Sequence, residues 1–221
     1  MDIIKYGIYR GPNIGIYINV NDKFVFIPNG FAKTKAENLA RYLQTECITT
    51  PVANTRLLGV PMVLNNHGIL LPSTSSPEEI ANLRKQTDLN VKILDTKYNA
   101  LGNLICANDK GGIVSPVIEK EYIKEIEDVL DIEVMQKKVD GYYRVGAVMQ
   151  ANNLGCVIHP ETDEEDMKKF SEILGVNIEH STINGGTPFV SSGMLVNNNA
   201  IVVGNLTNGP EIMMLTRAFT S

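Results

Sequence analysis

Five copies of one pattern follow one another along the chain, and this repetition limits the possible folds more than any other feature. Successive anchor glycines are 44, 43, 44 and 47 residues apart, and an asparagine follows each glycine after six residues. The pairs are Gly15 and Asn21, Gly59 and Asn65, Gly102 and Asn108, Gly146 and Asn152, and Gly193 and Asn199. Repeats of this length indicate units that bury their apolar faces against each other.

Each repeat predicts a hairpin followed by a helix. The Asn-Asp pairs, the Asn-Asn pairs and the glycines between two apolar runs tolerate the positive φ that tight turns require. Proline follows the second run in four copies, where it ends the strand: Pro28, Pro72, Pro116 and Pro160. Helical spacing then begins, and Thr34 with Glu37, Ser76 with Glu79, and Thr162 with Glu165 predict capping boxes. A short alternating strand after each of the first four helices completes a β-β-α-β unit.

The two ends of the chain complement each other. The fifth helix has no strand after it, whereas residues 3–9 form an alternating strand that belongs to no repeat. We therefore expect the N-terminal strand to complete the fifth unit and close a ring, which removes the exposed ends of an open solenoid. The predicted fold class is α+β, with residues 1–221 forming one five-repeat ring domain whose repeats start near residues 15, 59, 102, 146 and 193.

Composition excludes several classes of protein. The chain is 43% hydrophobic and 20% charged, and it has neither an apolar run that could span a bilayer nor an N-terminal secretory pattern. We expect a cytoplasmic protein without a membrane partner. Cys47, Cys106 and Cys156 are too few and too scattered for a disulfide framework or a zinc site. A net charge of -5 argues against naked nucleic acid as the sole ligand and favours a basic protein surface.

Four stretches resemble the translation initiation factor 6 family in its archaeal form. They are NTRLLGVPMVLNNHGILLP, NALGNLICAND, NNLGCVIHP and STINGGTPFVSSGMLVNNNAIVVG, and the resemblance extends from about Asp2 to Phe219. It implies a pentein-type fold, a β/α propeller of five quasi-equivalent units with the sheets inward and the helices outward. No cofactor and no metal are expected.

The resemblance also implies a function. Members of this family bind the intersubunit face of the large ribosomal subunit and sterically prevent the small subunit from joining. The expected partners are ribosomal proteins, a nearby loop of the large rRNA and the release factors of ribosome maturation. The chain itself is expected to be monomeric and not an enzyme.

Two other classes of function remain open. Pentein folds also include hydrolases of guanidino substrates, which use a cysteine nucleophile with a histidine and acidic residues. The fifth repeat, where those enzymes carry the cysteine, has none, and Cys156 and His159 are three positions apart on one predicted strand, so they point to opposite faces. A structural interaction module unrelated to ribosomes is the third class.

The candidate contact residues are polar residues of the turns and crossovers. A closed ring places equivalent turns on one rim, so turn residues that most simply shape the hairpins could also form a polar contact ring. These are Asn66, His67, Asn108, Asp109, Asn152 and Asn153. Asn103 and Asn184 lie in the crossovers, where they either satisfy main-chain groups or, as the resemblance implies, contact the ribosome. The sequence leaves open which face docks.

Overall fold

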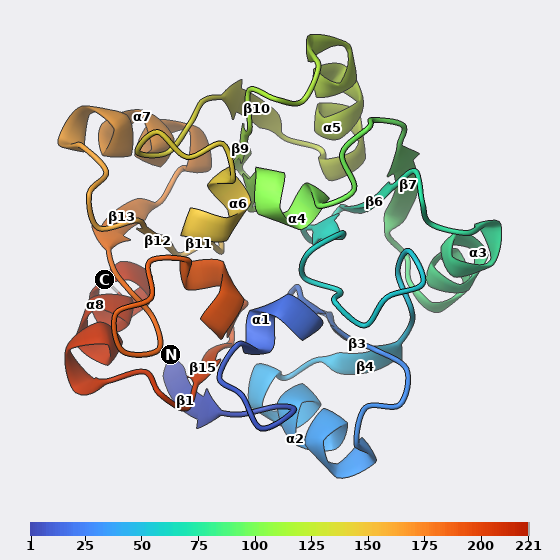
Figure 1. Ribbon diagram of the computed structural model, residues 1–221, viewed down its shortest axis with the longest axis horizontal. Coiled ribbons are helices and arrows are strands. Elements are labelled where there is room, and N and C mark those ends of the chain that lie inside the picture. The colour runs from blue at the N-terminus through green and yellow to red at the C-terminus, as the bar shows by residue number, and fades with distance from the viewer. Residues whose placement is uncertain (221) are drawn as a thin grey trace.

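The computed structural model describes residues 1–220 and contains five three-stranded sheets arranged around one axis (Figure 1). In the first four sheets the first two strands are antiparallel, and the third, which follows a helix, is parallel to the second. The first three sheets contain β2 (Asn19–Val20), β3 (Phe24–Ile27) and β4 (Glu46–Thr49); β5 (Val63–Leu64), β6 (Gly68–Pro72) and β7 (Asn90–Leu94); and β8 (Ile105–Ala107), β9 (Gly111–Val114) and β10 (Glu133–Gln136). The fourth contains β11 (Met149–Ala151), β12 (Gly155–Ile158) and β13 (Asn177–His180).

The fifth sheet joins the two ends of the chain. It contains β14 (Met194–Val196), β15 (Ala200–Gly204) and β1 (Asp2–Tyr6). Strand β1 runs parallel to β15, with Asp2 opposite Ala200 and Tyr6 opposite Gly204. This position is taken in the other four units by the strand after the helix, so the predicted completion of the fifth unit is confirmed.

Long helices form the periphery of the ring (Figure 1). They are α2 (Lys33–Leu43), α3 (Pro77–Gln86), α5 (Ile123–Leu130), α7 (Glu164–Leu174) and α8 (Gly209–Thr220), with the 3-10 turn η1 (Lys120–Tyr122) before α5. Each helix buries its apolar stripe on a sheet, as Leu39 and Leu43 of α2 do. The apolar core is therefore divided into five clusters around the axis. No helix among residues 1–220 is long and apolar enough to cross a membrane.

One of the three predicted capping boxes is confirmed. The Ser76 side chain accepts a hydrogen bond from the Glu79 N–H, and the Glu79 carboxylate accepts one from the Ser76 N–H. The other two predictions were wrong. Helix α2 begins after Ala32, before Thr34, and has no side-chain cap. Helix α7 is capped by Asp163, which accepts from the Asp166 N–H, one residue after the predicted Thr162.

Four of the five predicted anchor glycines lie in short helical turns where the sequence had indicated strands, and Gly59 lies in a hydrogen-bonded turn. The helical turns are α1 (Ile14–Tyr17), α4 (Leu101–Leu104), α6 (Val145–Val148) and the 3-10 turn η2 (Val190–Gly193). Neighbouring turns approach so closely that a Cβ at Gly59 would overlap the carbonyl oxygen of Gly15, and Gly102 and Gly146 face the same limit. A Cβ at Gly15 would overlap the carbonyl oxygen of Ser191.

The fifth anchor is therefore Ser191, and the prediction of Gly193 was wrong by two residues. The side chain of Ser191 donates a hydrogen bond to the Ala147 carbonyl at 3.2 Å. Gly193 is needed for another reason, because a Cβ there would overlap the side chains of Asn184 and Ile183.

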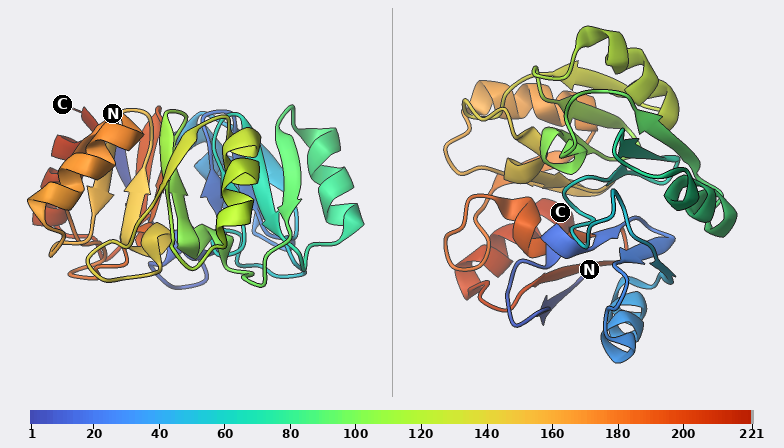
Figure 2. Two further views of the ribbon diagram at one scale, coloured as in Figure 1. Left: turned by 90° about the horizontal axis from the view of Figure 1, so that it is seen from above. Right: turned by 45° about the vertical axis from the view of Figure 1, so that its right-hand side comes forward.

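Seen from the side, the molecule is a flat disc with strands running through its thickness (Figure 2). One face carries the turns between the two antiparallel strands of each unit, residues 21–23, 65–67, 108–110, 152–154 and 197–199, and we call it the hairpin face. The opposite ends of these strands carry the connections between units, residues 7–18, 50–62, 95–104, 137–148 and 181–193, and we call this the crossover face.

Candidate functional site

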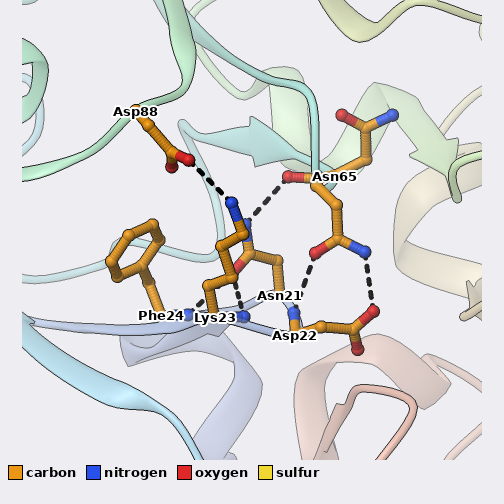
Figure 3. A network of polar contacts seen from close by, with 7 residues as sticks. Asn21, Asp22, Lys23, Phe24, Asn65 and Asp88 are labelled. Atoms are coloured by element: carbon orange, nitrogen blue, oxygen red, sulfur yellow. Dashed lines mark hydrogen bonds and ion pairs between the residues drawn. The ribbon is translucent and has the colours of Figure 1, made fainter.

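An inner ring of asparagines closes the hairpin face. Each side-chain amide donates to the main-chain carbonyl of the equivalent asparagine in the next unit, at 2.8–3.1 Å. The order around the ring is Asn21, Asn65, Asn108, Asn152, Asn197 and back to Asn21. Figure 3 shows the first of these bonds, from Asn21 to Asn65. The fifth member is Asn197, so the prediction of Asn199 was wrong.

The side chains of these asparagines are fully engaged in hydrogen bonds within the protein. In each, the side-chain oxygen accepts main-chain N–H bonds from the residues two and three positions later, as Asn65 does from His67 and Gly68. In three units the amide also donates to a carbonyl at the end of the next unit's helix, for example from Asn108 to Leu174. Because Asn108 and Asn152 are only 4% and 6% exposed, a docking partner cannot reach them.

A second ring lies beside the first on the hairpin face. Its members are Asp22, Asn66, Asp109, Asn153 and Asn198, and the main-chain N–H of each donates to the side-chain oxygen of the next, at 2.7–3.1 Å. The two carboxylates are not adjacent, and each accepts from two amides: Asn66 and Asn198 donate to Asp22, and Asn66 and Asn153 donate to Asp109. The candidate residues Asn66, Asp109 and Asn153 thus hold the ring together, whereas the His67 side chain is exposed.

The axial channel between the faces offers no reaction chamber. Its volume is about 70 Å³, and its lining includes Ile18, Met62, Ile105, Met149 and Met194. Burial raises the pKa of the Cys106 thiol to about 12 and that of Cys156 well above its ordinary value, and partial burial also raises the pKa of Cys47. A thiol needs to ionise to act as a nucleophile, so complete burial works against this role for Cys106 and Cys156, whereas Cys47 is exposed.

His159, three positions after Cys156 in the sequence, contacts residues other than a cysteine. The Nδ1 of His159 lies 3.0 Å from the Asp140 carboxylate and 3.3 Å from the Glu161 main-chain N. No cysteine among residues 1–220 hydrogen-bonds a histidine, and these residues contain no group of three potential metal ligands.

Tight turns shape the crossover face in four of the five units. They are closed by the bridges Ile8–Gly11, Val52–Thr55, Val139–Tyr142 and Ile183–Thr187, and their central residues have positive φ. Glu211 of α8 accepts hydrogen bonds from the N–H groups of Gly185, Gly186 and Asn208 and from the Thr182 hydroxyl. Burial alone would raise the pKa of the Glu211 carboxyl, but these donors together hold it below its usual value.

The two crossover candidates differ in what they contact. Asn184 has a φ of 55° and donates to the Pro12 carbonyl at 3.2 Å, so it joins the last crossover to the first. The half-buried Asn103 has no side-chain hydrogen bond to any residue in 1–220, and its amide is available. The eight candidates therefore divide between the faces, six on the hairpin face and these two on the crossover face.

A recess of about 410 Å³ opens at the axis on the crossover face. All five units contribute to it, through Gly15, Gly59, Asn103, Ala147 and Ser191, and the side chains of Arg144 and Phe189 also line it. The lining includes the glycines Gly15 and Gly59 and the apolar Phe189, while Asn103 and Arg144 supply hydrogen-bond donors. No carboxylate belongs to the lining.

Sequence reasoning missed the exposed side chains around this recess. All four exposed large aromatics of residues 1–220, Tyr9, Tyr142, Tyr143 and Phe189, belong to the crossover face. So do the exposed Arg10, Arg56 and Arg144. The available signal was a basic residue two to five positions before the anchor glycine in each of the first four repeats: Arg10, Arg56, Lys97 and Arg144.

Comparison of folds defines the class of protein. The chain aligns with a crystal structure of a dimethylarginine dimethylaminohydrolase in adduct with S-methyl-L-thiocitrulline, with a TM-score of 0.51 over 81% of this chain and 70% of the other at 14% identity. This likeness concerns the fold alone, and with the five units described above it makes the protein a pentein-type ring.

Sequence comparison gives the family. A sequence model of the eIF-6 family matches residues 3–218. Proteins named translation initiation factor 6 from Cenarchaeum symbiosum and Nitrosopumilus maritimus are each 64% identical over 219 residues, covering 99% of this chain and 99% of theirs. The protein of the same name from Saccharolobus solfataricus is 38% identical over 99% of both chains. The chain belongs to the eIF-6 family, as the resemblance indicated.

Proposed function

We propose that this protein binds the large ribosomal subunit and prevents the small subunit from joining it. The observation that carries this proposal is the 64% identity, over 99% of both chains, to relatives named translation initiation factor 6. Partners in this process include ribosomal proteins, a nearby rRNA loop and the factors that release the protein during large-subunit maturation. The site of action is the cytoplasm.

The docking surface in this proposal is the crossover face. Ten Asn and Asp side chains of the hairpin face are engaged in two closed hydrogen-bond rings, whereas the crossover face carries available donors, exposed aromatics and a recess. Aromatic residues and arginine are enriched at protein interfaces, and they dominate binding energy when they become buried. Of the sequence candidates, Asn103 belongs to this surface directly and Asn184 supports it.

Steric exclusion is a sufficient mechanism for such a protein. A compact chain of 221 residues has a radius of gyration of roughly 17 Å, which is large enough to cover a docking surface on its partner. The closed ring resists deformation because each unit hydrogen-bonds both neighbours. A rigid disc on one subunit then blocks the approach of the other without any covalent chemistry.

The experiment is co-sedimentation with isolated large and small archaeal subunits, followed by a subunit-joining assay with and without the protein. We expect sedimentation with the large subunit alone and suppression of joining. Two alanine variants compare the faces: Asn103→Ala on the crossover face should weaken binding, whereas His67→Ala on the hairpin face should not. Sedimentation with neither subunit would overturn the proposal, and weakening by His67→Ala alone would move the docking surface to the hairpin face.

A guanidino-group hydrolase is the rival function, because a solved hydrolase shares the fold. It needs an ionisable cysteine beside a histidine, yet Cys106 and Cys156 are buried with raised pKa values. Turnover of arginine or agmatine that is lost in Cys156→Ala would favour the hydrolase, and we expect no turnover.

A further inference from the structure

Three asparagines of the chain are followed directly by glycine. The pairs are Asn29–Gly30, Asn184–Gly185 and Asn208–Gly209. In such a pair the main-chain nitrogen of the glycine can attack the side-chain amide carbon of the asparagine, because glycine has no side chain to hinder the approach. The attack requires an asparagine side chain that is free to turn and a glycine N–H that no other group holds.

Two of the pairs are held by hydrogen bonds around Glu211. The Gly185 N–H donates to both oxygens of the Glu211 carboxylate, at 3.0 and 3.1 Å. The Asn184 side-chain oxygen accepts from the Thr207 hydroxyl at 3.3 Å. The Asn208 side-chain oxygen accepts from the Glu211 N–H at 3.0 Å, and the Asn208 N–H donates back to the Glu211 carboxylate at 2.8 Å. Turning either asparagine side chain toward the next nitrogen therefore breaks at least one hydrogen bond.

The third pair, Asn29–Gly30, has no such contacts. Both residues are exposed, and neither the Asn29 side chain nor the Gly30 N–H forms a hydrogen bond with any residue in 1–220. The pair occupies the centre of a turn that is closed by a bond of 3.2 Å from the Phe31 N–H to the Pro28 carbonyl, and Gly30 has a φ of 73°. Of the three asparagines, Asn29 is therefore the most open to attack.

This turn lies at the crossover face, beside Arg56. The Phe31 ring packs edge-on against Tyr9 of the first crossover segment, with 5.8 Å between the ring centroids. The Nη2 atom of Arg56 is 3.3 Å from the position that a Cβ on Gly30 would take. Arg56 is exposed and forms no hydrogen bond or ion pair with any residue in 1–220. A carboxylate formed at position 29 would therefore arise next to a guanidinium group that has no carboxylate partner.

We propose that Asn29 is a site of spontaneous deamidation and that the carboxylate formed there neutralises Arg56 on the crossover face. The Gly30 nitrogen loses its proton and bonds to Cγ of Asn29, and the C–N bond of the side-chain amide breaks to release ammonia. Water then opens the five-membered ring at either carbonyl, which gives aspartate or isoaspartate with one added negative charge. The reaction consumes one water molecule and needs no oxidant or reductant. The modification is independent of the proposed function, whereas its effect on subunit binding rests on that function.

Mass spectrometry of the full-length protein, incubated at neutral and at alkaline pH, tests the modification. The tryptic peptide of residues 24–33 contains Asn29 as its only asparagine, so the mass of this peptide reports this site alone. We expect conversion to be faster at alkaline pH, because the deprotonated nitrogen attacks. It should also be at least about tenfold faster than at Asn184, the factor that one hydrogen bond to a charged group contributes. Asn29→Gln should abolish it, because the longer side chain forms the corresponding ring far more slowly. No conversion of Asn29, or equal conversion of Asn29 and Asn184, would overturn the inference.

Co-sedimentation with the large subunit tests the effect on docking. Asn29→Asp should weaken binding about fivefold, the range of one exposed charge pair, and should have no further effect in an Arg56→Ala background. Asn177→Asp is the matched control, because it adds the same charge at an exposed position where β13 begins, beside the hairpin face, and it should change nothing. Unchanged binding of Asn29→Asp, or an equal loss in Asn177→Asp, would overturn the neutralisation of Arg56. If the wild-type protein binds no large subunits, only the proposed function fails, since the mass measurement decides the modification without it.

Discussion

The side-chain amide of Asn197 donates a hydrogen bond of 3.1 Å to the main-chain carbonyl of Asn21, although 176 positions separate the two residues. The same bond joins each pair of neighbouring units, so the last unit contacts the first just as the others contact each other. The ring has no terminal unit, which distinguishes it from open repeat proteins whose end units need polar caps.

Replacing Asn197 should open this ring. In Asn197→Ala the Asn21 and Leu43 carbonyls lose a donor, and the Asn199 and Ala200 N–H groups lose an acceptor. Buried polar groups left unpaired cost about 1–3 kcal/mol each, so we expect unfolding in urea to require about 3 kcal/mol less. Asn199→Ala is the control and should cost under about 1 kcal/mol, because its amide makes one bond of 3.3 Å. Equal losses in both variants would contradict the assigned register.

The pair Asn197 and Asn199 also marks where sequence reasoning reached its limit. The repeat period, the hairpins and the exchange of the N-terminal strand followed from the sequence, and all are present. The expectation of positive φ in the hairpin turns was wrong, because the residues with positive φ lie elsewhere. The register of the fifth repeat did not follow from the sequence. Three consecutive asparagines fit the turn equally well, and Gly193 lies about as far before them as the anchor glycines of the other repeats lie before their asparagines. The contact between Ser191 and Gly15 and the hydrogen bond from Asn197 to Asn21 decide between them.

Alanine at an anchor glycine should be poorly tolerated. In Gly59→Ala the new methyl group would overlap the Gly15 carbonyl oxygen, which is main chain and cannot move without shifting α1. We expect a loss of at least about 3 kcal/mol, measured by thermal and urea unfolding. Gly209→Ala is the matched control, because nothing lies within 4 Å of a Cβ at that position. A tolerated Gly59→Ala would mean that the short helical turns can separate.

The second ring should require a carboxylate, and not an amide, at position 109. Asp109 accepts from Asn66 at 2.6 Å and from Asn153 at 2.5 Å, so Asp109→Asn would set an amide against two amides. We expect a loss of about 3 kcal/mol in urea unfolding, since both charge-assisted bonds disappear. Asp88→Asn is the control, because Asp88 is exposed in a surface pair with Lys23 and its replacement should leave the stability almost unchanged. Equal losses would show that net charge matters and the ring does not.

The candidate site was harder to predict than the fold because free side chains leave no periodic signal. Turn asparagines are prominent in the sequence, yet in the structure they are the groups most fully engaged with each other. Arg56 and Arg144 precede their anchor glycines by different distances, so an alignment on glycine does not superimpose them. Their availability depends on which carboxylates lie near them in space.

Glu211 should make the stability of the protein depend on pH. Its pKa is lower in the folded chain than the value of about 4.3 for an unfolded glutamate, so its contribution is complete above that value. The contribution is lost as the pH falls through the lower folded pKa, because protonation removes the acceptor for Gly185, Gly186 and Asn208. Glu211→Gln should therefore lower the Tm at neutral pH by about 4–8 °C, which corresponds to about 2 kcal/mol. The difference from the wild-type protein should shrink as the pH is lowered below about 4.3, the pKa of an unfolded glutamate.

Glu172→Gln, at an exposed position of α7, serves as the control and should match the wild-type protein throughout. A Tm difference for Glu211→Gln that stays constant between neutral and acid pH would refute this role of the carboxylate.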